Sequence, residues 1–522
     1  MLILFRPGPY ICGEWDLGGF PARLLSPPFS FLRTYSPSYI SELTRWYSVL
    51  LPIIEPHLVN NGGNIAMVQV ENEYGSFGDV TKNPNDEKYI RYLVTLTRKH
   101  LGPSVVLYTT DGGNYESMRR GSLPGSIVLT LGDYGPGTDL SIPADGQGKM
   151  NPPSSNPLMC TEYYTGWLTH YGEDIAVTST QDLVGTLEVM IEGNVSFNLY
   201  MADGGTNFGF WAGANGGGGT DYQPDITSYD YNSPISESGV HNVGSDGGDK
   251  FGAIRDLMIE KFGDVPEEPP FRASIGYGDV VMSSVSSPLL SFLLSRPVVL
   301  TDKATKQEDM GQRFGLTAYA FGTGECEGCK VEIGGIADYA NVYVDGVFVV
   351  SGFRADGDIA LEVGKGQRVD VVVEGMGRIN FSSGIYDRKG LGGIKVDGEE
   401  VGDVEHRFWE VEDVGGIEWG DREDGQGGSR LYRGTFEVDE GDAGSTFVDV
   451  SGFGKGMVFV NGFNLGRFWT EKGPVLTLWC PDEVVKEGTN EIVVMEVKEG
   501  GGEGGGEGVA LVEGPQVAKQ KA

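Results

Sequence analysis

The amino-acid sequence predicts an α/β barrel of the TIM type followed by an all-β region that forms two β-sandwiches. Three observations predict this fold class. Short apolar runs alternate with helix-like segments as far as about residue 262, which is typical of a parallel sheet. Beyond the acidic, proline-rich segment 263–274, apolar and polar residues alternate between Gly and Asp turns, which is typical of antiparallel strands. The length of 522 residues suggests about three domains.

The first region contains candidate strands at 2–7, 65–72, 104–110, 126–132, 157–164 and 195–201. Helical apolar spacing over 36–58 and 85–101 places helices between the first three strands. The strands are apolar almost throughout, which indicates burial on both faces, and polar residues gather just past their C-terminal ends. We therefore expect a functional site at that end of the barrel.

The second region contains strand candidates at 313–321, 339–350, 367–375, 445–469 and 490–497. NVYVDGVFV and MVFVNGFNLG each read as a strand, an Asp-Gly or Asn-Gly turn and a second strand, which indicates two related sandwiches. The predicted division is a barrel over 1–262, a linker with the first β-strands over 263–310, sandwiches over 311–400 and 401–497, and a disordered Gly/Glu-rich tail over 498–522.

The charge excludes several classes of partner. The chain has 74 Asp and Glu against 39 Lys and Arg, a net charge of −35, which argues against nucleic-acid binding and against adhesion to anionic membranes. We expect no membrane span, because no apolar run reaches the ~18 residues that a membrane helix needs. The apolar start MLILFRPG is too short for a signal peptide.

Cysteine and histidine usage predicts neither a metal nor a cofactor. Five cysteines in a long chain form no disulfide framework, and only Cys326 and Cys329 lie close together in the sequence. This isolated C-x-x-C lacks the other ligands of a zinc site, which leaves a local disulfide or two free thiols. The five histidines are scattered without ligand spacing.

Carboxylates follow three of the candidate strands. Glu14 comes after the first strand, Glu71 and Glu73 end the second, and Glu162 lies at the end of the fifth. A buried carboxylate is costly unless it is paired, hydrogen-bonded or used in chemistry. Paired carboxylates within an aromatic wall are what glycoside cleavage needs; the alternative is that some of these acids cap helices or pair with basic residues such as Arg6. The nearby aromatic residues are Tyr10, Trp15, Tyr74, Tyr163, Tyr164 and Trp167.

Six motifs together resemble the β-galactosidases of glycoside hydrolase family 35, which include lysosomal and plant acid β-galactosidases. They are RPGPYICGEWDLGGFP, VQVENEYGSFG, TEYYTGWLTHYG, GGTNFGFWAGAN, TSYDYNSPISESG and VFVNGFNLGRFW, in the order of the family, and the resemblance extends to about Val497. It implies a retaining exo-β-galactosidase that acts on terminal β-galactose of glycans, with jelly-roll, galactose-binding-like sandwiches and a vacuolar, lysosomal or extracellular location.

The resemblance also assigns roles to individual residues. It makes Glu73 the general acid/base and Glu162 the nucleophile. Phe210 stands where the family has a tyrosine, which puts the orientation of the nucleophile or of a sugar hydroxyl in doubt. The residues implied to contact the sugar are Cys12, Gly13, Glu14, Asn72, Tyr164, Trp167, Phe210, Tyr229 and Tyr231.

Family members normally carry about two further β/α units before RPGPY, so the resemblance implies an incomplete barrel. We expect unpaired edges at strands 2–7 and 195–201, with apolar surface exposed. The chain is then either a truncated piece of an enzyme or a genuine short form, and an inactive carbohydrate-binding protein is the alternative to a β-galactosidase. Another glycosidase of the same barrel clan is a third possibility.

Two further expectations concern single asparagines and glutamates. Of the sequons at Asn194 and Asn380, only Asn380 is predicted to accept a glycan, because Asn194 begins a predicted buried strand. Strand alternation puts Glu71 and Glu73 on the same side and does not distinguish them. If Asn72 and Glu73 both face the sugar, the strand must break its alternation, which predicts a bulge there and a structural partner for Glu71.

Overall fold

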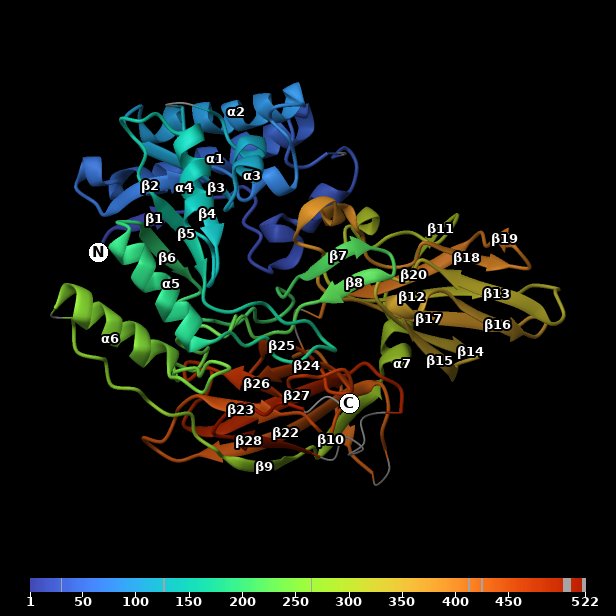
Figure 1. The fold of residues 1–522 in the computed structure, drawn as a ribbon. Helices are drawn as coiled ribbons and strands as arrows, with labels where there is room; N and C mark the ends of the chain where they lie inside the picture. The colour runs from blue at the N-terminus through green and yellow to red at the C-terminus, as the bar shows by residue number, and fades with distance from the viewer. Residues whose placement is uncertain are drawn as a thin grey trace.

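The computed structural model of the chain describes residues 1–29, 31–124, 127–263, 265–411, 414–423, 426–500 and 508–518. An α/β region at the N-terminus packs against two β-rich regions (Figure 1). One β-region extends to the side of the α/β region, and the other lies across the end of its sheet where β4 and β5 finish (Figure 1). No described helix combines the length and the apolar character that a bilayer span requires.

The α/β region contains the predicted parallel sheet, with strand order β1-β2-β3-β4-β5-β6. Within the described residues β1 pairs only with β2, and β6 pairs only with β5, so the sheet is an open half-barrel. Leu2, beside β1, is 70% exposed, in line with the predicted apolar edge. The strands are β1 (Ile3–Phe5), β2 (Ile65–Gln69), β3 (Val106–Gly112), β4 (Leu129–Tyr134), β5 (Met159–Tyr164) and β6 (Ser196–Tyr200).

Helices connect consecutive strands of this sheet, and local sequence explains where they begin. In α1, Pro37 occupies the first helical position, where its missing N–H costs nothing. The Asn83 side chain accepts a hydrogen bond from the Asn85 amide and caps α2. The helices are α1 (Pro37–Ile54), α2 (Pro84–Leu101), α3 (Tyr115–Gly121), α4 (Ser141–Met150) and α5 (Thr180–Glu192). After the hairpin of β7 (Ala214–Gly218) and β8 (Asp221–Pro224) comes α6 (Lys250–Phe262).

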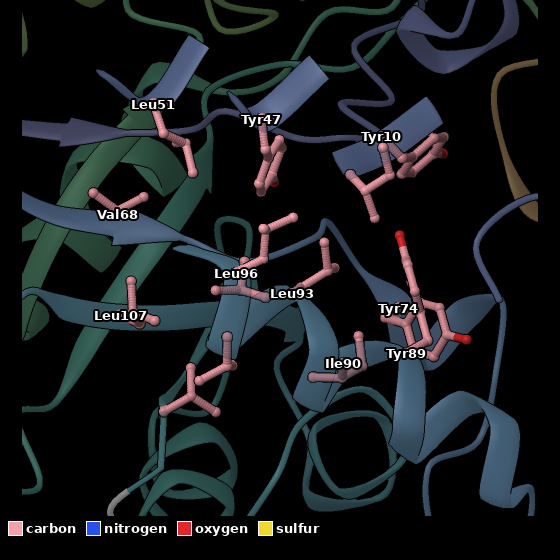
Figure 2. Close-up of a cluster of buried hydrophobic side chains, with 14 of the residues drawn as sticks. Tyr10, Tyr47, Leu51, Val68, Tyr74, Tyr89, Ile90, Leu93, Leu96 and Leu107 are labelled. Atoms are coloured by element: carbon pink, nitrogen blue, oxygen red, sulfur yellow. The ribbon is translucent and has the colours of Figure 1, made fainter. Parts of the chain in front are cut away.

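The core of the half-barrel forms between this sheet and the first two helices. Tyr47 and Leu51 of α1, Leu93 of α2, Val68 of β2 and Leu107 of β3 are among its buried side chains (Figure 2). The apolar positions of α1 recur every four residues, which directs one face of the helix toward the sheet. This packing fixes the C-terminal end of β2, where Glu71 and Glu73 follow.

The first β-region is a sandwich of a six-stranded and a four-stranded sheet, with orders β11-β20-β12-β17-β14-β15 and β16-β13-β18-β19. The predicted boundary at residue 400 is wrong, because β20 pairs with β12 and therefore belongs to this domain. Its strands are β11 (Val299–Thr301), β12 (Gly315–Gly322), β13 (Cys329–Gly334), β14 (Tyr339–Val344), β15 (Val347–Phe353), β16 (Ile359–Val363), β17 (Arg368–Gly375), β18 (Gly393–Val396), β19 (Glu399–Glu400) and β20 (Val404–Trp409).

The C-terminal sandwich takes its strands from both sides of the first one. Its sheets have the orders β21-β10-β22-β27-β24-β25 and β26-β23-β28-β9. Two strands of the predicted linker region therefore belong to this domain. The strands are β9 (Gly278–Val281), β10 (Ser284–Pro288), β21 (Gly420–Asp421), β22 (Arg430–Val438), β23 (Thr446–Asp449), β24 (Lys455–Val460), β25 (Phe463–Trp469), β26 (Thr477–Cys480), β27 (Gly488–Glu496) and β28 (Gly508–Val512); α7 (Leu289–Leu294) follows β10.

Strand β28 corrects the prediction that the whole tail is disordered. It lies between β23 and β9, and its Val509 and Leu511 are buried in the sandwich core. The short apolar segment GVALV is enough to complete a sheet whose neighbours come from distant parts of the chain, which composition does not reveal. Residues 501–507 and 519–522 of the predicted tail lie outside the described residues.

The burial of the two sequon asparagines is the reverse of the prediction. Asn380 is fully buried, and its side-chain Nδ2 lies 3.4 Å from a Glu14 oxygen, so the folded chain leaves no room for a glycan there. Asn194 is exposed, in the turn between α5 and β6. The expectation failed because β6 is an edge strand of an open sheet, and its first residues face solvent rather than a neighbouring strand.

Candidate active site

The predicted catalytic residues lie around a cavity of about 320 Å³ at the C-terminal end of the parallel sheet. Residues from the loop after β1, the ends of β2 and β5, and the loops beyond β6 line it together. Nine predicted site residues belong to this lining: Cys12, Gly13, Glu14, Asn72, Glu73, Glu162, Tyr164, Trp167 and Tyr231. Segments separated by more than 200 residues thus converge on one pocket.

The chain leaves β2 through two residues with left-handed backbone conformation. Glu71 has φ 63° and Glu73 has φ 44°, values that are uncommon for residues other than glycine. The strand itself ends at Gln69, so the break in alternation comes from these two residues and not from a bulge in the ladder. As a result Asn72 and Glu73 both line the cavity.

Glu71 is held by structural partners, as expected. Arg33 donates to it from Nε (3.1 Å) and Nη2 (2.7 Å), and Tyr89 donates from its hydroxyl (2.9 Å). Arg33 and Glu71 are each about 1% exposed in their side chains, and Arg33 also stacks on Tyr10 at 3.6 Å from the ring centroid. Glu71 therefore anchors the end of β2 and leaves Glu73 for the cavity.

Glu162 forms an ion pair with Arg6, which also donates to the Oδ1 of Asn72. The same Asn72 oxygen accepts from Gln69 Nε2 at 3.1 Å, and Asn72 Nδ2 donates to Glu73 Oε2 at 3.2 Å. Arg6 lies just past β1, so its charge and the amide of Asn72 join the ends of three strands. The alternative that Arg6 pairs with one of the acids is therefore correct for Glu162, without removing it from the cavity.

Glu73 is in the protonated form at neutral pH. The surrounding protein desolvates its carboxyl, and the negative charges of Glu162 and Glu14 add to this, which raises the pKa of Glu73 to about 8. The nearest cationic side chains, Arg33 and Arg6, oppose the shift but are occupied by Glu71 and Glu162. The two glutamates thus line one cavity in different surroundings, Glu73 desolvated and Glu162 paired with Arg6.

The loop Cys12–Glu14 has left-handed φ values at three successive residues and carries Glu14 into the cavity. Glu14 accepts from the Tyr231 hydroxyl at 2.5 Å, and Asn380 Nδ2 lies 3.4 Å from its other oxygen. Asn380 Nδ2 also lies 3.5 Å from the Cys12 sulfur. Burial raises the pKa of Glu14 and that of the Cys12 thiol, so the thiol stays protonated and is no nucleophile here.

Two predicted residues occupy other positions. Phe210 is not part of the cavity lining; it is buried and stacks on Phe314 of the first β-region, with ring centroids 5.1 Å apart. Tyr229 is also absent from this lining but lines a neighbouring cavity, and its hydroxyl is 2.7 Å from that of Tyr200.

Sequence reasoning missed several residues of the site. Tyr200 lines the cavity, and its position at the end of β6 is a signal that the strand pattern already contained. Phe381 lines the cavity and Asn380 lies beside Glu14; both come from the first β-region, which no local sequence pattern places at the barrel. Leu168, His170 and Asn215 complete the lining. Asp133, opposite Glu162 in the β4–β5 ladder, is a further buried acid, and burial raises its pKa well above the usual range.

The C-x-x-C motif forms a local disulfide between Cys326 and Cys329, one of the two alternatives left open. The same cysteines and Asp397 are the one group of potential metal ligands found among the described residues. Because the disulfide occupies both sulfurs, this group does not offer a thiolate set to a metal. It also lies in the first β-region, away from the catalytic cavity.

A desolvated glutamate, an arginine-paired glutamate and a stacked Trp167–Tyr231 pair in one pocket, at the end of a parallel barrel sheet, are typical of a glycosidase site. Three protein-family models match the chain. The model described as "Glycosyl hydrolases family 35" matches residues 1–260. The models described as "Beta-galactosidase, first all-beta domain" and "Beta-galactosidase, galactose-binding domain" match residues 305–408 and 430–490. The last two agree with the strand pairing that assigns β20 to the first sandwich.

Sequence similarity to known proteins extends across all of these regions. The chain is 36% identical to beta-galactosidase 17 of Arabidopsis thaliana, over 95% of this chain and 75% of that protein. It is 36% identical to the beta-galactosidase of Bos taurus, over 98% of this chain and 80% of that protein, and 35% identical to that of Homo sapiens, over 95% and 75%. The chain belongs to glycoside hydrolase family 35.

Proposed function

We propose that the protein is a retaining exo-β-galactosidase that removes terminal β-linked galactose from glycans. The observation that carries this proposal is the pairing of a protonated Glu73 with the Arg6-bound Glu162 in one cavity. Catalysis by two carboxyl groups needs one acid and one carboxylate at the same pH, and opposite surroundings supply them here. The volume of the cavity, about 320 Å³, suits a single sugar ring and so favours cleavage at the end of a sugar chain.

In the proposed mechanism Glu162 attacks the anomeric carbon and forms a galactosyl ester, while Glu73 gives its proton to the departing glycosidic oxygen. Water then attacks the same carbon, Glu73 takes a proton from this water, and the ester bond to Glu162 breaks. The two displacements retain the β configuration. This geometry requires the two carboxyl groups to lie about 5–5.5 Å apart.

We assign the remaining cavity residues to the galactose ring. Glu14 and Asn72 present oxygen and nitrogen atoms to sugar hydroxyls, and Tyr164, Tyr231 and Trp167 provide aromatic surface. Tyr231 and Asn380 fix the two oxygens of Glu14 from opposite domains. Recognition of galactose then depends on the first β-region as well as on the barrel.

The kinetic test compares three glutamine variants on lactose and on nitrophenyl β-galactoside. Glu162→Gln should abolish turnover of both substrates. Glu73→Gln should lower kcat/KM for lactose by about 10²–10⁴-fold and spare kcat/KM for the nitrophenyl compound, because this parameter reports the first displacement and the nitrophenyl leaving group needs no proton there. Glu71→Gln is the matched control and should mainly lower stability; equal losses for Glu71→Gln and Glu73→Gln would contradict the roles.

The alternative function is a carbohydrate-binding protein without turnover, and the open edges at β1 and β6 favour it. It predicts galactose binding by the unmodified chain with no hydrolysis of either substrate. Proton NMR of the reaction separates the two functions, because the proposed enzyme releases β-galactose first and α-galactose only after mutarotation. Release of the α anomer first would contradict the retaining mechanism.

We further propose that the protein follows the secretory route to a vacuole, a lysosome or the cell exterior. The acidic composition, with a net charge of −35, and the exposed sequon at Asn194 are compatible with this route. Enzymatic deglycosylation of the protein from its native source should reduce its mass, and Asn194→Gln should remove that change. An unchanged mass would remove the support that Asn194 gives.

A further inference from the structure

A second cavity of about 270 Å³ adjoins the catalytic one and extends to the C-terminal β-region. The two cavities share Glu14, Trp167, Leu168 and Tyr231 in their linings. The second cavity is bounded on one side by barrel residues between 225 and 242, and on the other by residues of the C-terminal sandwich between 475 and 479. The two cavities are therefore neighbours that meet at these four side chains.

Asp225 lines the second cavity and lacks hydrogen-bond partners. It is 5% exposed, and neither of its carboxyl oxygens accepts a hydrogen bond within the described residues. His170 Nε2 lies 3.4 Å from one of them, but this nitrogen is already 2.9 Å from Asn215 Oδ1. An unsatisfied buried carboxyl destabilises the fold, and hydrogen bonds from a ligand's hydroxyl groups would offset this loss.

The pKa of the Asp225 carboxyl indicates which ligand groups it can bind. Burial raises the pKa of this carboxyl well above its usual range, with the charges of Glu14 and Glu173 adding to the shift. A raised pKa favours the protonated carboxyl, which can donate as well as accept hydrogen bonds and so suits sugar hydroxyls.

Aromatic side chains form the remainder of the wall. Trp167 is 52% exposed at the boundary between the two cavities, and Trp479 and Phe447 reach the second cavity from the C-terminal sandwich. Phe208 stacks beside Trp479 with ring centroids 6.0 Å apart, and the Trp479 indole N–H is buried without an acceptor. Aromatic faces with nearby unpaired polar atoms are typical of carbohydrate-binding sites.

We propose that this second cavity binds the sugar residues that precede the terminal galactose in a neutral β-galactosyl oligosaccharide, with Asp225 and Trp479 as the main contacts. The C-terminal sandwich then selects the length and linkage of the substrate, while the catalytic cavity selects galactose. This inference rests on the proposed hydrolysis of galactosides, but binding in the second cavity can be measured without it.

The test compares β-1,4-galactotriose with methyl β-galactoside, which is too short to reach the second cavity. Trp479→Ala and Asp225→Ala should each lower the ratio of kcat/KM for the trisaccharide to that for the methyl galactoside by about tenfold. Asp225→Asn keeps hydrogen-bonding groups and should lower the ratio by about threefold at most. Trp46→Ala, on the exposed face of α1, is the matched control.

A ratio that stays equal to that of Trp46→Ala in both alanine variants would overturn the inference. Trp479→Phe keeps an aromatic ring and serves if Trp479→Ala does not fold, with the same ratio as the readout. If the unmodified chain hydrolyses neither substrate, the proposed enzyme activity fails, and calorimetric binding to the Glu162→Gln chain decides the inference separately. Galactotriose should then bind about tenfold more tightly than galactose, and Trp479→Ala should remove the difference.

Discussion

Buried acids occur in two regions of this molecule, and their pKa values shift in opposite directions. At the rim of the barrel sheet, desolvation and neighbouring carboxylates raise the pKa of Glu73 to about 8. At the junction of the barrel with the first β-region, Asp338 is also desolvated, but Lys389 and Arg354 outweigh this and lower its pKa. Lys389 Nζ lies 2.8 Å from Asp338, and Arg354 lies at the same distance.

The difference teaches that burial alone does not mark a catalytic acid. Two further junctions between domains follow the paired pattern: Arg378 bridges Asp16 of the barrel and Glu308, and Lys455 of the C-terminal sandwich pairs with Glu374 of the first. These pairs fix the relative position of the three regions. The rim instead holds more carboxyl groups than cations, which keeps one of them protonated.

Removal of a cation from the paired region should have the largest effect on stability. Lys455→Met leaves Glu374 buried with Arg467 no closer than 3.9 Å, and should lower the free energy of unfolding by about 3–5 kcal/mol. Denaturant titration measures this. The control is Lys365→Met, which breaks an exposed pair with Glu325 and should cost less than about 1 kcal/mol. Equal losses would show that the junction is not held by its ion pairs.

The pH dependence of the free energy of unfolding should depend on Glu73, at the rim of the barrel sheet. Between an unfolded pKa near 4.5 and a folded pKa of about 8, native Glu73 retains a proton that the unfolded chain releases. Stability therefore falls as pH rises through this window, by at most about 1.4 kcal/mol per unit from this group. In Glu73→Gln this part of the decline should vanish. Parallel stability curves for the two proteins from pH 5 to 8 would contradict the raised pKa.

The smallest expected effect concerns the contact of Asn380, in the first β-region, with Glu14 at the rim of the barrel sheet. Asn380→Ala removes the amide beside Glu14 and Cys12 and should raise KM for galactosides by up to about tenfold, with a smaller change in kcat. Steady-state kinetics measures the two parameters. The control is Asn60→Ala, at an exposed position, which should leave kcat and KM unchanged. A fall in kcat with constant KM would mean that Asn380 acts on the reacting groups and not on sugar binding.

Much of the barrel site could be predicted from the sequence because its signals are local. Apolar strands that end in acids identified Glu14, Glu73 and Glu162, and the parallel topology then brought those ends to one edge of the sheet. Strand periodicity could not separate Glu71 from Glu73. The choice depends on left-handed backbone at both residues and on Arg33, which comes from a loop 38 residues earlier.

The sequence by itself determined the order of strands and helices in the half-barrel, the all-β character of the rest, and membership of the cavity for nine residues. Only the tertiary structure decided that β9, β10 and β28 complete the C-terminal sandwich, that Phe210 packs on Phe314, and that Asn380 reaches the pocket. The physical reason is the distance along the chain over which each effect acts. Propensity and periodicity act over a few residues, whereas strand pairing between distant segments and the pKa of a buried carboxyl depend on groups that folding alone brings together.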